Sequence, residues 1–128
     1  MKSLDHRAAE TFRALVALKK TEIESPDDPS LSVRLEIVGR MEGYTLFALT
    51  HFELLDGQRL RAPEMHIAYI RRTGRFAAIH YRNDLLEIDT YSAIPASDGL
   101  RLRDAALQEV HARTASRWLH RIGARLIG

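Results

Sequence analysis

The first 20 positions alternate between hydrophobic and polar residues with the period of a helix. Between Leu4 and Lys19, apolar side chains return every three or four residues, which places them on one face of an amphipathic helix. Ser3 or Asp5 can cap the start of this helix. A polar segment with two prolines follows at residues 25–30. Because each proline removes a backbone donor, we expect the helix to end before this segment.

The middle of the chain has the alternating pattern of β-strands. Apolar and polar residues exchange with a period of two, and short groups of glycine, asparagine and aspartate interrupt them. We expect five strands, at residues 31–37, 44–53, 64–72, 75–82 and 85–91. The connections between them are short enough for hairpins, so the sequence predicts a five-stranded antiparallel sheet.

The last third of the chain returns to helical spacing. A polar segment at residues 92–99 offers Ser97 or Asp98 as the cap of a long helix, from about Leu100 to Ile122 or beyond. The predicted fold class is therefore α+β. It has an N-terminal helix, a five-stranded antiparallel sheet and a long C-terminal helix packed on the sheet.

Size and composition limit the classes of protein that this chain can belong to. Residues 1–128 have the length of a single domain, and 45% hydrophobic with 28% charged residues suits a packed core under a polar surface. No apolar stretch is long enough to span a bilayer, and Asp5 and Glu10 interrupt the region where a signal peptide would be apolar. There is no cysteine, which suits a reducing compartment. We expect a cytoplasmic protein with no membrane partner.

The hairpin formed by residues 64–72 and 75–82 predicts which side chains share a face. We take Thr73 and Gly74 as a two-residue loop. One face then holds Met65, Ile67, Tyr69, Phe76, Ala78 and His80, and the other holds His66, Ala68, Ile70, Ala77, Ile79 and Tyr81. Both faces are largely apolar, whereas two helices cover only one of them. We therefore expect a homodimer whose contact face includes Ile67, Tyr69 and Ile79, unless the sheet curls around its own core.

Six histidines make metal binding a candidate chemistry, because imidazole is a common metal ligand. In the register above, His66 and His80 point to opposite faces, and the sequence has no HxH, HxxxH or HExxH pair. A three-residue loop would instead shift the register and bring His66 near His80 or Arg82. If the loop has two residues, we expect no metal and no cofactor.

Three common motifs of catalysis and phosphate binding are missing from the sequence. It contains no GxSxG, GxGxxG or GxxxxGK. Thr50 and His51 cannot pair as nucleophile and base, because neighbouring residues of a strand point in opposite directions. We therefore expect no catalytic residues and no enzymatic activity. An alternative is a small-ligand or hydrolase-like pocket made up of His51, Glu64 and Tyr81, although a cross-strand hydrogen bond is the simpler interpretation of His51.

Charge is distributed unevenly, although the formal net charge is only +2. Residues 1–69 carry nine cations and eleven anions, whereas residues 70–128 carry ten cations, all arginine, and six anions. Four of these arginines recur at every fourth position of the C-terminal helix, beside an apolar face that contains Trp118. We call them the arginine row: Arg113, Arg117, Arg121 and Arg125.

Like charges at this spacing repel one another unless anions lie beside them. The arginine row is therefore either a solvated stripe balanced by carboxylates from nearby loops or a surface that binds the phosphates of a nucleic acid. We expect Trp118 to be a core residue rather than a base-stacking one.

Turn and strand-entry residues form a recognisable series through the middle of the chain. They are Thr50-His51-Phe52, Asp56-Gly57, Pro63-Glu64-Met65, Gly74-Arg75, Tyr81 and Asn83-Asp84. From about Leu35 to Tyr91, the series resembles a bacterial domain-of-unknown-function family often encoded on plasmids and integrative conjugative elements. The chain departs from that pattern at Gln58 and Ala62, where the family commonly has acidic residues. The resemblance implies the fold and a mobile-element setting, and it carries no activity.

These observations predict a small binding or regulatory protein that acts through protein–protein interaction. It would cover an unidentified protein partner with its second sheet face or with the helix that carries the arginine row. The first alternative is a nucleic-acid-binding accessory protein that uses the arginine row. The second is the pocket around His51.

Overall fold

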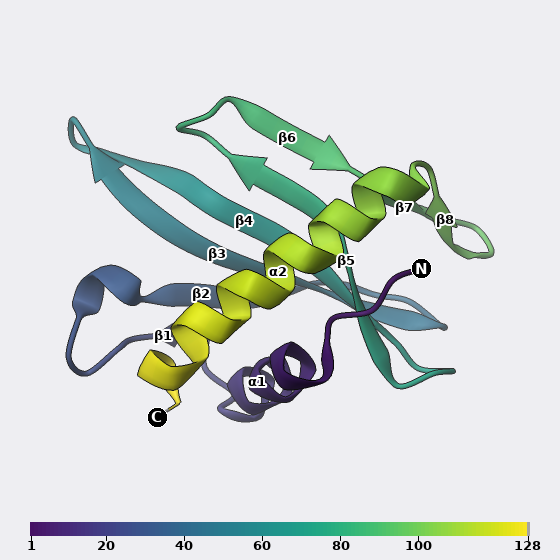
Figure 1. The fold of residues 1–128 in the computed structure, drawn as a ribbon, viewed down its shortest axis with the longest axis horizontal. Helices are drawn as coiled ribbons and strands as arrows, with labels where there is room; N and C mark the ends of the chain where they lie inside the picture. Colours follow the sequence, from purple (N-terminus) through teal and green to yellow (C-terminus); the bar gives the residue numbers. More distant parts are fainter. Residues whose placement is uncertain (128) are drawn as a thin grey trace.

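The chain runs through a helix, a series of strands and a second helix, and the computed structural model describes residues 1–127 (Figure 1). In chain order the elements are α1 (His6–Ala17), β1 (Glu22–Ile23), the short 3-10 helix η1 (Pro29–Leu31), β2 (Val33–Arg40), β3 (Tyr44–Leu55), β4 (Gln58–Ile70), β5 (Arg75–Asn83), β6 (Ile88–Tyr91), β7 (Ala93–Ala96), β8 (Gly99–Leu102) and α2 (Ala105–Leu126). Within these residues, neither α1 nor α2 has the length and apolar character needed to cross a membrane.

The predicted α+β class is confirmed, but the number of strands is not five. Strands β1 to β6 form one six-stranded antiparallel sheet in sequence order, and β7 pairs with β8 in a small second sheet. Strand β1 has only two residues, too few for an alternating pattern. The β7–β8 hairpin lies where we expected a loop. Because β8 extends to Leu102, α2 begins later than predicted and is capped by Asp104 rather than Ser97 or Asp98.

Both helices cover the same face of the sheet and enclose the main core. Phe12 and Leu15 of α1 and Leu119 of α2 are fully buried against Leu49 and Ile67 of the sheet. Each such side chain stabilises the fold by about 1.5–3 kcal/mol through removal of apolar surface from water. Trp118 is 4% exposed and belongs to this core, as the sequence predicted.

The β7–β8 hairpin covers part of the opposite face, which we call the second face. Ala93 of β7 packs there with Tyr44, Leu46 and Ile79. Figure 1 shows the hairpin at the end of the sheet where α2 begins. The expected dimer face is therefore not a free surface. Ile67 is 0% exposed beneath the helices and Ile79 is 1% exposed beneath the hairpin, while Tyr69 packs at the edge of the helix-side core.

The register of β4 and β5 also differs from the prediction. Ile70 pairs with Arg75, so the loop has four residues rather than two, and Gly74 closes it with a φ of 67°. A β-bulge between His66 and Ile67 then shifts the pairing by one residue, so that His66 lies directly opposite His80. Our placement of these two histidines on opposite faces was wrong.

Candidate functional site

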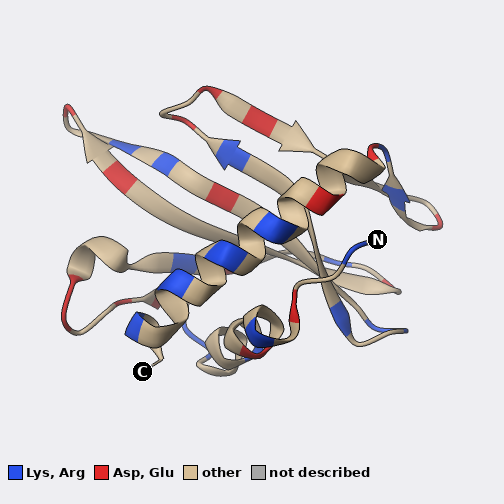
Figure 2. Cartoon of the chain, in the orientation of Figure 1, with Lys and Arg blue, Asp and Glu red and all other residues tan. Residues whose placement is uncertain are grey.

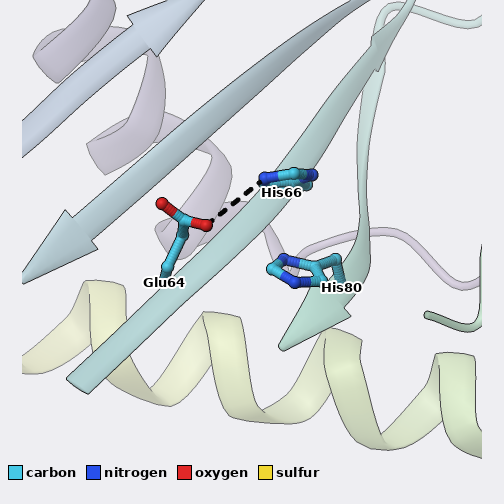
Figure 3. Close-up of side chains that lie close together, drawn as sticks. All are labelled: Glu64, His66 and His80. Atoms are coloured by element: carbon cyan, nitrogen blue, oxygen red, sulfur yellow. Dashed lines mark ion pairs between the residues drawn. The ribbon is translucent and has the colours of Figure 1, made fainter. Parts of the chain in front are cut away.

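Three metal-ligating side chains gather on the second face, beyond the part that the β7–β8 hairpin covers. We call Glu64 and His66 of β4 and His80 of β5 the polar cluster. One donor atom from each residue lies within 4.8 Å of those of the other two. Figure 3 shows the Glu64 carboxylate turned towards His66, whose imidazole lies beside that of His80. His66 Nε2 is 3.6 Å from Glu64 Oε2. The ring centroids of His66 and His80 are 4.1 Å apart.

Neighbouring side chains hold two members of the polar cluster in place. The Thr50 hydroxyl donates a hydrogen bond to Glu64 Oε1 across 2.8 Å, and Arg61 Nε lies 3.4 Å from the same oxygen. On the other side, His80 Nε2 is 2.8 Å from Asp89 Oδ1. These contacts leave Glu64 Oε2 and His80 Nδ1 as the atoms not engaged by an outer partner. His80 Nδ1 is buried and has no hydrogen-bond partner within residues 1–127.

The environment of the polar cluster also sets the charge of its members. The His66 imidazole, with smaller contributions from Thr50 and Arg61, lowers the pKa of Glu64 to about 2 against the opposing effect of burial. Burial, followed by the nearby His66, lowers the pKa of His80. At neutral pH, Glu64 is therefore a carboxylate and His80 is neutral. These are the forms in which both residues can act as ligands.

Part of this cluster is marked by the spacing of residues along the chain. Glu64 and His66 are two apart on a strand and therefore share a face. His80 joins them only through the four-residue loop and the bulge, which local periodicity does not reveal. Our argument against a metal site rested on a regular register without a bulge and does not hold.

The arginine row lies on the solvent-exposed side of α2, and all four of its side chains are exposed. Figure 2 shows them as blue bands along α2 to its C-terminal end. Arg125 Nη1 lies 4.0 Å from Asp28 Oδ2. Among the described residues, Arg113, Arg117 and Arg121 have no carboxylate within ion-pair distance. The loop carboxylates that would balance a solvated stripe are thus found at one end of the row only.

The structure does not bring together the three residues of the predicted pocket. His51 Nδ1 is 3.1 Å from the carbonyl oxygen of Ser32, which directly precedes β2, and its Nε2 is 3.0 Å from Oε1 of Glu53 on its own strand. Tyr81 packs against the helix-side core, whereas Glu64 lies on the second face. His51 instead lines a cleft of about 480 Å³ together with members of the arginine row, Arg121 and Arg125.

Fold and sites together define a small α+β protein with two helices on one face of an antiparallel sheet, a polar cluster on the other face and a row of exposed arginines. The chain belongs to the family described as a domain of unknown function, DUF6908, whose model matches residues 6–125. No similar protein is found among the curated proteins or the solved structures. Family membership therefore assigns no activity, and the bacterial mobile-element setting stays a prediction.

Proposed function

We propose that this protein is a small binding protein that holds nucleic acid against the arginine row of α2. The observation that carries the proposal is that Arg113, Arg117 and Arg121 are exposed and have no carboxylate partner within residues 1–127. An arginine side chain stays charged and can donate two parallel hydrogen bonds to a phosphate. Several such groups in line suit a partner with repeated anionic groups.

The geometry of the helix favours an extended polyanion over a single small anion. Residues four apart in an α-helix are separated by about 6 Å along its axis, so the row extends over about 18 Å. The opposite side of α2 is anchored in the core by Trp118, Leu119 and Ile122, which keeps the row on a rigid element. The guanidinium groups can therefore contact successive phosphates without a change in the backbone.

Two of the sheet-face residues that we expected to contact another protein molecule are buried. Ile67 and Ile79 are core residues of the single chain, so neither is available to another molecule unless the fold opens. The arginine row is the remaining surface on which that expectation rested. An acidic protein would also suit it, and the experiment below distinguishes the two partners. A homodimer and a cytoplasmic location stay predictions.

Fluorescence anisotropy tests the proposal directly. The protein is titrated into a labelled DNA duplex and a labelled single strand, at salt concentrations from about 50 to 300 mM. We expect the logarithm of the affinity to fall linearly with the logarithm of the salt concentration. Replacing Arg117 and Arg121 together by Ala should weaken binding and reduce the slope by about 2, since each lost phosphate contact on a duplex removes about 0.9.

A matched control removes the same charge elsewhere. Arg72→Ala combined with Arg101→Ala takes two exposed arginines from the β4–β5 turn and from β8 and leaves α2 intact. This variant should bind almost as the natural chain does. If both double variants lose affinity equally, net charge rather than the row is responsible, and the proposal fails. Equal binding of polyglutamate at the same salt concentration would assign the row to an acidic protein instead.

A further inference from the structure

We propose that Glu64, His66 and His80 bind one divalent transition-metal ion, such as zinc, on the second face of the sheet. Two imidazoles and a carboxylate are a donor set that suits zinc and its neighbours in the first transition row. One donor atom of each residue lies within 4.8 Å of those of the other two, and the residues come from two adjacent strands. The site is separate from the arginine row, because Glu64 and His66 lie on the sheet face opposite to α2.

The unpaired nitrogen of His80 is the observation that points to an outside ligand. The His80 side chain is 1% exposed, and its Nδ1 has no hydrogen-bond partner among the described residues. A buried polar atom without a partner costs free energy, and nearly all such atoms in folded proteins are paired. A metal ion at Nδ1 would remove this cost.

The other nitrogen of His80 already has the partner that metal-binding histidines usually have. Nε2 lies 2.8 Å from Asp89 Oδ1, so a proton on Nε2 leaves the lone pair of Nδ1 free. Histidines that bind a metal through one nitrogen commonly donate the other N–H to a carboxylate, which fixes the ring and strengthens the ligand. Asp89 is 53% exposed and thus delivers this contact from the rim of the site.

Glu64 is oriented in a comparable way. Thr50 and Arg61 both contact Oε1, which leaves Oε2 on the side of His66. Two of the three proposed ligands therefore have an outer partner on one atom and a second atom that is free to bind.

The spacing of the donors is close to what an ion requires. Donors at about 2.1 Å from a tetrahedral zinc ion are about 3.4 Å apart, so separations of up to 4.8 Å must close by at most about 1.4 Å. Glu64 and His66 are 16% and 17% exposed, which leaves them room to rotate and leaves an entry path from solvent. Three protein ligands leave at least one coordination position for water or an external ligand.

Calorimetric titration with zinc chloride tests the site, on tag-free protein that has been treated with a chelator and dialysed. We expect one ion per chain, and Co²⁺ should give visible absorption bands that report the donor set. Asp89→Asn changes the outer partner of His80 and should weaken zinc binding by a factor of about 10 to 100, as for other outer partners of metal ligands. Glu64→Gln and His66→Asn change proposed ligands, both half-buried. Each of these two variants should weaken zinc binding by at least the same factor. Circular dichroism verifies that each variant is folded.

Two further measurements separate this site from adventitious binding. The control variant replaces His6 and His120, which lie near Glu10 and Asp5 on the helices, by Asn and should bind zinc as the natural chain does. Nitrogen NMR of the imidazoles should show zinc-dependent changes at His80 Nδ1. The proposal is overturned if zinc binds no more tightly than about 0.1 mM (about 5.5 kcal/mol). It is equally overturned if affinity is lost in the control but retained in His66→Asn.

Discussion

Gly123 of α2 lies so close to Thr11 of α1 that no other residue fits at its position without movement. A Cβ atom built on Gly123 would be 2.8 Å from Thr11 Cγ2 and 3.0 Å from Thr11 Oγ1. Both distances are too short for ordinary van der Waals contact. The two helices that cover the sheet therefore pack against each other through a glycine, which permits this approach despite its low helix propensity.

The first prediction concerns this contact. Gly123→Ala should lower the free energy of unfolding, because an overpacked side chain costs about 1–3 kcal/mol and exceeds the gain of about 1 kcal/mol in helix propensity. In a Thr11→Ala background the clash is removed, so Gly123→Ala should instead be neutral or stabilising. Urea denaturation of the four proteins in this cycle measures the change of sign. A destabilisation that is the same in both backgrounds would contradict the contact.

The second prediction tests the assignment of Ile67 to the core. Because Ile67 is 0% exposed beneath the helices, Ile67→Ala should lower the free energy of unfolding by about 2–5 kcal/mol. Leu54→Ala, at a hairpin position that is 72% exposed, should change it by less than about 0.5 kcal/mol. Denaturant melts combined with light scattering provide both values. If Ile67→Ala dissociated a dimer with no loss of stability, Ile67 would be an interface residue after all.

The third prediction concerns Gln108, a buried polar residue of α2 that ties the N-terminus to the sheet. Its Oε1 accepts from the Lys2 backbone N–H, and its Nε2 donates to the carbonyl oxygens of Lys2 and Ala78. Gln108→Met keeps the shape and leaves these groups without their partner, which should cost about 2–4 kcal/mol. Hydrogen exchange at the backbone amide of Leu4 should also accelerate, because Gln108 no longer ties the N-terminus to the sheet. Gln58→Met, at the exposed first residue of β4, is the control and should leave both measurements unchanged.

The fourth prediction is a pH dependence that arises from His111. Burial lowers the pKa of His111 to about 4, and the neutral ring contacts the hydroxyls of Ser92 and Thr90. In the unfolded chain the pKa returns to about 6.5, so between these values the unfolded state binds the proton and the folded state does not. The contribution of His111 is therefore fully present above about pH 6.5 and is lost as the pH falls towards 4.

Urea unfolding at about pH 7.5 and 5 measures this effect. The natural chain should lose about 2 kcal/mol between these two values through His111. His80, whose pKa is also lowered by burial, adds to the loss in the same direction. His111→Gln should be less stable at neutral pH but should depend less on pH. A pH dependence as steep as that of the natural chain would show that another group is responsible.

The sequence alone determined the helices, the strands of the central hairpins, and which side chains of α2 are buried or exposed. Period-of-three-or-four spacing identified α1 and α2, and it placed Trp118 in the core and the arginine row outside, since a helix of known phase has only one buried stripe. Alternation identified five of the six strands of the main sheet, although β4 begins six residues earlier than predicted and the other ends differ by up to three.

Tertiary structure alone decided how those elements meet. Nothing local marks the four-residue loop that Gly74 closes or the bulge beside His66, and a shift of one residue in a strand exchanges its faces. The polar cluster, the burial of Ile79 under the β7–β8 hairpin and the close contact of Thr11 with Gly123 all depend on pairing between distant segments. Periodicity is a property of neighbours along the chain, whereas register is set by the packing of the whole sheet.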